Sequence, residues 1–276
     1  MLSTSIPQRR RGRALGNFQA IEMIGSLLGQ SMGGFLASIF TMRTNFLLST
    51  VLGGVALGVV TMIKGKSHYS EAISPKGSFL PSKKAFLMIL NPTVLLSCAM
   101  IFIFMSRNNG LESTILPLYI TEEMRIPLTQ YGLMVTLTTI GSVAGNIIGG
   151  SLSDKYGRKI VLASGFILAA FATALLVLAK SFLFFVPLMF LNGISWGITY
   201  GTIPALVADS VPNQSRGMGI GIFRTFFDSG GLFGPILFSS ILNAVGGHQG
   251  YLSTFYAAII LMIFNLIMVA KLKKSR

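Results

Sequence analysis

The sequence predicts an all-α polytopic membrane protein, and three observations support that prediction. Of its 276 residues, 52% are hydrophobic and only 11% are charged, whereas soluble domains carry about 25% charged residues. The apolar residues form continuous blocks, each about as long as the ~20 residues that a bilayer crossing needs. These blocks also lack the apolar-polar alternation of half-buried strands. Membrane-spanning helices are therefore the expected elements.

Eight spans are expected, in chain order, at residues 14–40, 45–64, 85–120, 130–150, 159–179, 181–207, 217–243 and 251–270. The first follows a basic start, but it contains Gln19, Glu22 and Gln30 and is too long for a secretory signal. The third is long, and we interpret it as a helix kinked at 108–110, where Asn and Gly weaken it locally. A helix that ends near Phe104, followed by a loop, is the alternative.

The basic residues gather at one set of span ends, which sets the expected orientation. Seventeen of the 22 Lys and Arg residues fall on one side, in 9–13, 64–84, 155–159, 216 and 271–276. The other side has Arg43, Arg107, Arg125 and Lys180, and Arg224 lies within a span. Because cytoplasmic loops collect Lys and Arg, both termini are expected in the cytoplasm. Topology thus explains the net charge of +14 without a nucleic-acid partner.

The chain matches itself when it is shifted by 205 residues. Identical residues then meet at Arg11/Arg216, Gly12/Gly217, Gly16/Gly221, Phe18/Phe223, Gly25/Gly230 and Gly29/Gly234. Repeated halves are common in secondary transporters. We therefore expect the last two helices of an N-terminal half at 1–64, a cytoplasmic linker at 65–84 and a six-helix C-terminal half at 85–276. Four further helices are expected upstream; the alternative is an eight-helix protein with a partial duplication.

A short charged loop joins two apolar spans in the stretch GGSLSDKYGRK, residues 149–159. Gly157 permits a turn with positive φ. Asp154 suits the positive N-terminal end of a neighbouring helix. Arg158 and Lys159 suit helix-end carbonyls or a carboxylate. The residue types therefore predict a loop that binds the ends of neighbouring helices.

This loop resembles the signature loop of the major facilitator superfamily, G-x-L-[AS]-D-[RK]-x-G-R-[KR], with Gly150 and Leu152 at its first positions. The resemblance covers the whole chain, as helices 5–12 of a twelve-helix transporter, and implies that fold. In the family this loop latches the outward-facing state, which assigns Asp154 and Arg158 to a gate. We interpret Lys155 as a basic residue that only helps to orient the chain in the membrane. Asp209 is expected to join the network through Arg158 or Arg216.

A second resemblance concerns glycines. In the first span Gly25, Gly29, Gly33 and Gly34 resemble the antiporter motif of drug-exporting facilitators, with Gln30 in place of its proline. The fourth span has a matching stripe at 141, 145 and 149 (Gly141, Gly145 and Gly149). Small residues four apart let membrane helices pack closely. We expect the two stripes to contact each other across the interface between the halves.

Charged residues inside spans are costly and point to function. The candidate substrate or proton sites are Glu22, Glu112, Arg224 and Asp228. Arg224 and Asp228 are four apart and can pair on one face, as a structural ion pair or as a substrate site. Glu112 suits proton coupling if the third span is continuous and is a loop charge otherwise. Glu22 suits proton coupling or a bond across a helix interface.

Trp196 and Tyr200 are also four apart and are flanked by glycines. They offer an aromatic wall to an amphipathic substrate, or they simply pack in the core. No P-loop, metal-ligand spacing, cofactor motif or nucleophile constellation is visible in the sequence. We therefore expect transport driven by ion gradients, without an enzyme activity, a cofactor or a bound metal.

The expected function is proton-coupled efflux of small molecules, of the multidrug type, at the plasma membrane. One alternative is uptake of a metabolite such as an organic anion, with Arg224 as its anchor. Another is a fragment that does not transport. The expected partners are a small-molecule substrate, protons, membrane lipid and either a missing N-terminal segment or a second copy of the chain.

Overall fold

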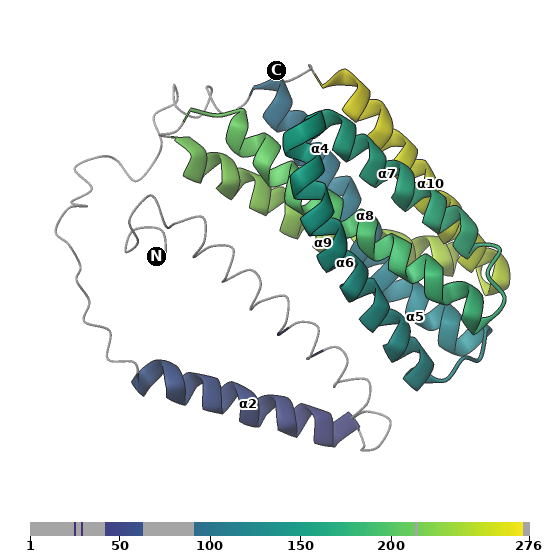
Figure 1. Ribbon diagram of the computed structural model, residues 1–276. Coiled ribbons are helices and arrows are strands. Elements are labelled where there is room, and N and C mark those ends of the chain that lie inside the picture. Colours follow the sequence, from purple (N-terminus) through teal and green to yellow (C-terminus); the bar gives the residue numbers. More distant parts are fainter. Residues whose placement is uncertain (1–24, 26–28, 30–41, 63–90, 213–214, 273–276) are drawn as a thin grey trace.

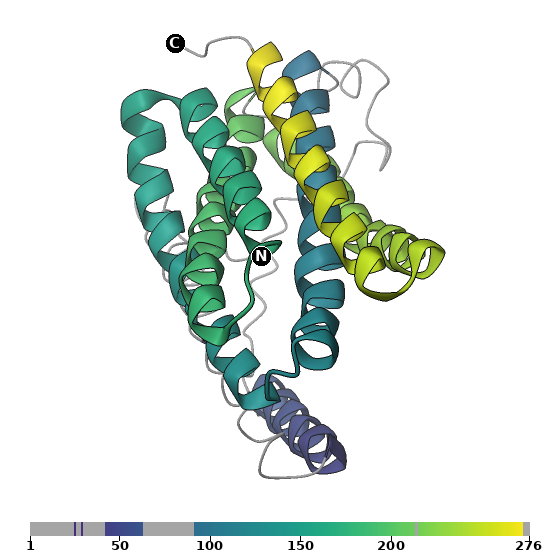
Figure 2. The same ribbon diagram turned by 90° about the vertical axis from the view of Figure 1, so that its right-hand side faces the viewer.

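The computed structural model describes residues 25, 29, 42–62, 91–212 and 215–272, and every regular element in that part of the chain is helical. Six of the described helices are long and apolar enough to cross a membrane. They pack side by side into one bundle, shown from two sides in Figures 1 and 2. The prediction of an all-α polytopic membrane protein is confirmed.

The six helices follow one another in the chain with short connections. They are the continuous run Pro92–Glu123, then α6 (Leu128–Tyr156), α7 (Arg158–Leu176), α8 (Phe182–Asp209), α9 (Arg216–Val245) and α10 (Gly247–Lys271). The closest neighbours are α6 with α8, α7 with α8, the start of the first long helix with α9, and α10 with α7. Segments far apart in sequence thus lie side by side.

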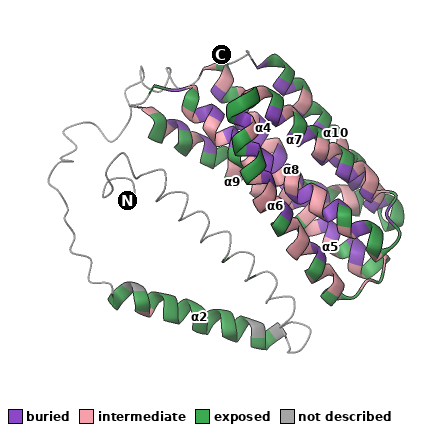
Figure 3. Cartoon of the chain, viewed as in Figure 1, coloured by how far each residue is buried: buried purple, intermediate pink, exposed green. Residues whose placement is uncertain are grey.

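The second expected span corresponds to α2 (Met42–Met62). Its described side chains are exposed, apart from the half-buried Gly58, and Figure 3 colours this helix accordingly. The first expected span lies outside the described residues except for Gly25 and Gly29, which are helical. The linker expected at 65–84 also lies outside them.

The third span begins later than residue 85. Asn91 has an extended backbone (φ −74°, ψ 156°), and its side chain accepts a hydrogen bond from the Val94 N–H at 2.9 Å. The helix α4 (Pro92–Arg107) therefore starts with an Asn cap followed by a proline, which is a strong start signal. Asn91 also donates to the Ser210 carbonyl at 2.7 Å, which ties this start to the end of α8.

Beyond α4 the helix continues with wider turns. The segments η1 (Asn108–Ile115) and η2 (Tyr119–Glu123) are π-helical, with the short α5 (Leu116–Leu118) between them. The alternative of a helix that ends near Phe104 is wrong, because 108–110 forms a π turn that keeps the chain helical. Arg107 was assigned to an outer loop by the charge count; it lies inside this helix and is buried.

Two apolar clusters fill the bundle, one toward each end. The first contains Phe104 and Phe166, whose rings lie 5.7 Å apart, together with residues of α8 and α10 such as Ile203 and Met262. The second contains Tyr119 and Phe255, with ring centroids 5.3 Å apart, and further residues of α7, α8 and α9. The six helices are therefore held together at both ends of the bundle.

Candidate functional site

The charged loop forms a tight turn between α6 and α7. Gly157 ends α6 and precedes α7 with φ 89° and ψ 151°, as its position in the sequence predicted. Its N–H donates to the Ser153 carbonyl at 3.0 Å. The turn holds Asp154 and Arg158 four residues apart, on the two sides of the glycine.

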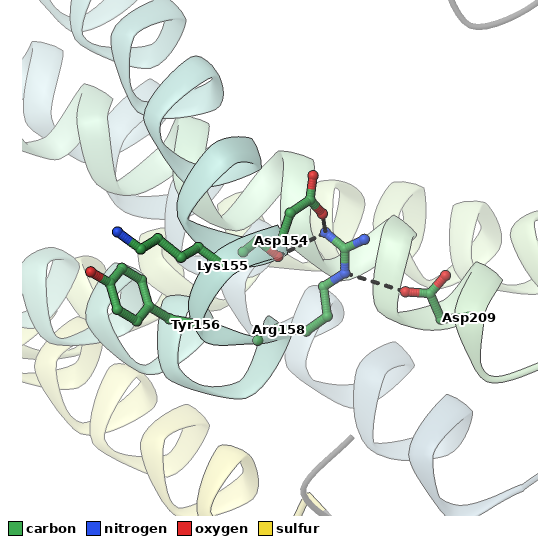
Figure 4. Close-up of a pocket in the computed structure, with 7 residues that line it drawn as sticks. Asp154, Lys155, Tyr156, Arg158 and Asp209 are labelled. Carbon is green, nitrogen blue, oxygen red and sulfur yellow. Dashed lines mark hydrogen bonds and ion pairs between the residues drawn. The ribbon is translucent and has the colours of Figure 1, made fainter. Parts of the chain in front are cut away.

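Arg158 connects three helix ends at this turn. Its Nη1 donates to Ser153 Oγ at 2.7 Å and lies 3.2 Å from Asp154 Oδ1. Its Nε donates to Asp209 Oδ2, at the end of α8, at 3.3 Å. Figure 4 shows the guanidinium between the two carboxylates. These residues line a pocket of about 390 Å³. The predicted link between Asp209 and Arg158 is confirmed, whereas Arg216 donates instead to the Ala208 carbonyl.

Lys159 binds the other side of the same turn. Its Nζ donates to the carbonyls of Ala270 and Leu272, at 2.7 and 2.6 Å. These are among the last carbonyls of α10, which have no partner within their own helix. A lysine there satisfies them and also complements the negative end of the helix dipole. Lys155, by contrast, lies over the ring of its neighbour Tyr156, with Nζ 5.2 Å from the centroid.

A group of aromatic and charged side chains joins α8 to α9. The rings of Trp196 and Tyr200 stack at 4.3 Å and 18°, and Tyr200 meets Phe227 edge-on at 5.9 Å. Arg224 lies over Phe227 at 4.5 Å and donates to Asp228 at 3.2 Å. The expected pairing of Arg224 with Asp228 is therefore confirmed. Trp196 and Tyr200 are half-buried, so their stack keeps an open edge.

The exposure of that ion pair is informative. The side chains of Arg224 and Asp228 are 58% and 59% exposed, although both lie inside a helix long and apolar enough to cross a membrane. A charged pair facing lipid is costly, so such residues normally face a water-filled cavity or other protein. By this argument, the side of α9 that carries Arg224 and Asp228 faces a water-filled cavity or other protein, and not lipid.

A third polar group lies inside the bundle. Arg107 forms an ion pair with Glu112 of η1 and donates to Thr173 of α7 and Asn192 of α8. The sequence had singled out Glu112 but not Arg107, Thr173 or Asn192. Thr173 and Asn192 are uncharged, so nothing in their own segments marked them. Arg107 could have been recognised because it lies within a single long apolar run. The count of charges at span ends placed it outside the membrane instead.

The glycine stripe of α6 has a different partner from the expected one. A Cβ on Gly141 or Gly145 would overlap the carbonyls of Phe190 or Ile194, and one on Gly149 would lie 2.9 Å from Ile198 Cα, all on α8. A Cβ on Gly25 or Gly29 would meet nothing within 4 Å. Among the described residues, the α6 stripe thus contacts α8, and Gly25 and Gly29 contact neither helix. Glu22, Gly33 and Gly34 lie outside the described residues.

Known proteins resemble the chain over its full length. The sequence profile of the Major Facilitator Superfamily matches residues 1–111 and 108–276. The multi-drug resistance efflux pump PmrA of Streptococcus pneumoniae is 28% identical over 282 residues, which cover 100% of this chain and 69% of PmrA. The uncharacterized MFS-type transporter YuxJ of Bacillus subtilis is 26% identical over 279 residues, covering 100% of this chain and 70% of YuxJ.

A more distant relative is the multidrug resistance protein MdtG of Yersinia enterocolitica, 23% identical over 273 residues that cover 96% of this chain and 63% of MdtG. The family match spans the whole chain, and the described helices, with the charged turn between α6 and α7, agree with it. The chain therefore belongs to the Major Facilitator Superfamily of membrane transporters.

Proposed function

We propose that the chain is a secondary active transporter that exports small amphipathic molecules in exchange for protons. The observation that carries this proposal is the Arg158 bridge, which joins the ends of α6, α7 and α8. Asp154 and Asp209 are well exposed, and exposed ion pairs contribute little stability. Such a bridge can open and close repeatedly during alternating access. PmrA and MdtG bear the names of multidrug efflux and resistance proteins, which supports export.

The group on α8 and α9 supports an amphipathic substrate. Trp196, Tyr200 and Phe227 present a continuous aromatic surface, which binds flat apolar groups and cations. The charge of Arg224 is already balanced by Asp228 at 3.2 Å. A paired arginine is a poor anchor for an organic anion, so the group favours export of amphipathic molecules over anion uptake.

The orientation that goes with this function places both termini in the cytoplasm, together with the turn at 154–159. The distribution of Lys and Arg supports this orientation. In the same proposal residues 85–276 act as the six-helix C-terminal half, and residues 1–64 belong to the other half. The two halves rock about a site near the membrane midplane.

Transport by the reconstituted chain tests the proposal. Proteoliposomes loaded with a fluorescent lipophilic cation are given a pH gradient, and efflux is followed with the wild type and with Arg158→Gln. We expect gradient-driven efflux in the wild type. We expect a loss of up to about fivefold in the variant, because an exposed ion pair is worth about 0.2–1 kcal/mol and ~1.4 kcal/mol is a factor of ten.

Lys155→Gln is the matched control, since it removes a cation from the same turn without touching Asp154 or Asp209. It should transport like the wild type. Equal losses in the two variants would mean that net charge, and not the bridge, matters. Efflux that ignores the pH gradient for a panel of cationic and neutral amphipathic dyes would contradict proton exchange.

A further inference from the structure

A layer of polar side chains crosses the bundle between its two apolar clusters. Arg107 separates the clusters on the first long helix, Thr173 separates them on α7, and Asn192 does so on α8. Arg107 is the last of the 16 residues of α4, within a span of 32 residues, so the layer lies near the middle of that span. Polar groups at this depth are costly and usually functional.

Arg107 holds three helices together at this layer. Its side chain is 1% exposed. Its Nη1 binds Glu112, and its Nη2 donates to the Thr173 hydroxyl and, at 3.1 Å, to Asn192 Oδ1. Among the described residues its Nε has no hydrogen-bond partner. The guanidinium is thus held in place by one charge and two neutral acceptors.

Glu112 is the member of the layer nearest to the surface. Its side chain is 9% exposed, and its two carboxylate oxygens accept hydrogen bonds from Arg107, from Asn192 Nδ2 and, at 3.0 Å, from Asn108 Nδ2. Each of these bonds suits the ionised carboxylate, which only accepts. Glu112 is therefore the group of the layer that can exchange a proton with water.

Arg107 is the one charged side chain bonded to Glu112 among the described residues. The other described acidic and basic side chains on the long helices and on η2 are Glu122, Glu123, Asp154, Lys155, Arg158, Lys159, Asp209, Arg216, Arg224, Asp228, His248 and Lys271. They lie at helix ends or, for Arg224 and Asp228, pair with each other. Among the described residues, Glu112 and Arg107 therefore form an ion pair that no other charged side chain joins.

The π-helical turn is what brings this pair together. In an α-helix two residues five apart lie about 140° apart around the axis, on different faces. In a π-helix the backbone bonds run from i to i+5, so residues five apart lie one above the other. Arg107 precedes η1 directly and Glu112 follows five residues later, inside it. The ion pair and the π turn therefore support each other.

We propose that Glu112 is the carboxyl group that binds the exchanged proton, with Arg107, Thr173 and Asn192 as its positioning residues and the π turn as the element that responds. This inference rests on the proposed proton-coupled transport. A proton from water on one side of the membrane adds to a Glu112 oxygen and later leaves to water on the other side. No other covalent bond changes.

Protonation changes the layer in a defined way. A neutral Glu112 loses its ion pair with Arg107 and turns one acceptor oxygen into a donor. Without that ion pair the π-helical form of η1 is less stabilised, so the segment can return to an α-helix. This change rotates the residues that follow. Among them are Tyr119, whose ring lies 5.3 Å from that of Tyr251 on α10, and Glu123, which is 2.9 Å from His248. Proton binding is thereby transmitted to α10.

Trp196 offers a direct readout of this change. It is the one tryptophan of the chain, and it lies on α8 one turn after Asn192. We would titrate the fluorescence of the purified chain in lipid nanodiscs with pH, without substrate and without a gradient. The wild type should show one sigmoidal change, and Glu112→Gln, which is nearly isosteric, should abolish it. Thr173→Val and Asn192→Ser should keep the change but displace its midpoint.

Glu122→Gln is the matched control, because it removes a carboxylate from the exposed end of the same long helix. It should titrate like the wild type. The proposal is overturned if Glu112→Gln titrates like the wild type, if the wild type does not respond, or if Glu122→Gln abolishes the response. Should Glu112→Gln fail to fold, unchanged midpoints in Thr173→Val and Asn192→Ser overturn it as well.

The titration and the flux assay fail independently. A response that depends on Glu112, with no gradient-driven efflux, would contradict the exporter but keep the proton-binding group. Efflux with a titration that ignores Glu112 would keep the exporter and remove this assignment.

Discussion

Gly157 shows how a single residue sets the geometry of the charged turn. Its φ of 89° and ψ of 151° lie in a region that residues with side chains rarely adopt. A Cβ built there would meet nothing within 4 Å, so packing does not require the glycine. The requirement is one of backbone conformation alone. The same backbone conformation places the Arg158 side chain within reach of Ser153 and Asp154.

Gly157→Ala should therefore lower the free energy of unfolding by about 1–3 kcal/mol through backbone strain. The measurement is the apparent unfolding temperature of the purified chain in detergent. Gly217→Ala is the control: it is exposed, helical and without neighbours within 4 Å of a Cβ, so it should be neutral or slightly stabilising. If both variants unfold at the wild-type temperature, the turn is not strained by a side chain.

At the residue scale the sequence predicted short-range pairs well. Arg224 and Asp228 pair because positions four apart share a helical face. The link from Arg158 to Asp209 was expected from a family resemblance, although the two residues are 51 positions apart. Arg107 was missed because counting charges by span ends assumes that cations lie outside the membrane. A buried ion pair breaks that assumption, and its neutral partners on α7 and α8 leave no mark in their own segments.

At the scale of elements, α6 and α8 are the most closely packed pair of helices in the bundle. Gly141 and Gly145 on α6 face the α8 backbone, and Gly193 and Gly197 on α8 face the carbonyls of Thr138 and Ser142. Because both helices have glycines at these positions, the backbones of α6 and α8 come into direct contact, as small residues allow in membrane helices. The two helices are thus held over several turns without large side chains between them.

Gly145→Ala should lower stability by about 1–3 kcal/mol, because its methyl group would overlap the Ile194 carbonyl and force the helices apart. The same change at Gly150, also on α6, meets nothing within 4 Å and should leave the unfolding temperature nearly unchanged. Unfolding in detergent measures both variants. Similar unfolding temperatures for the two would show that the close approach is not required.

The sequence predicted these elements better than their contacts. A glycine every four residues shows which face of α6 packs closely, but it does not show which helix lies there. The expected partner was the first span, and within the described residues these glycines contact α8. The start of α4 was missed for another reason. The run before it is apolar and conceals the boundary, while the informative signal is the pair Asn91-Pro92.

At the scale of the whole molecule, α7 offers a simple test of orientation. Lys155 lies just before it and Lys180 just after it, so the two lie on opposite sides if α7 crosses the membrane. The proposed orientation puts Lys155 in the cytoplasm and Lys180 outside. The one native cysteine, Cys98, is buried and should not interfere with thiol labelling.

Single cysteines at these two positions should therefore label differently in intact cells. We expect a membrane-impermeant maleimide to label Lys180→Cys at once and Lys155→Cys only after permeabilisation. The wild type, with Cys98 alone, is the control. The reverse pattern would invert the orientation, and labelling of both positions from outside would mean that α7 does not cross the membrane.

The hydrogen bonds from Lys159 to the last carbonyls of α10 have a practical consequence for protein engineering. A fluorescent protein or affinity tag fused shortly after Leu272 would be attached to the same short stretch of backbone that steadies the α6–α7 turn. Its freedom to tumble would follow the opening and closing of that turn. The anisotropy of such a fusion would therefore report on the transport cycle, and a rigid fusion would slow the cycle.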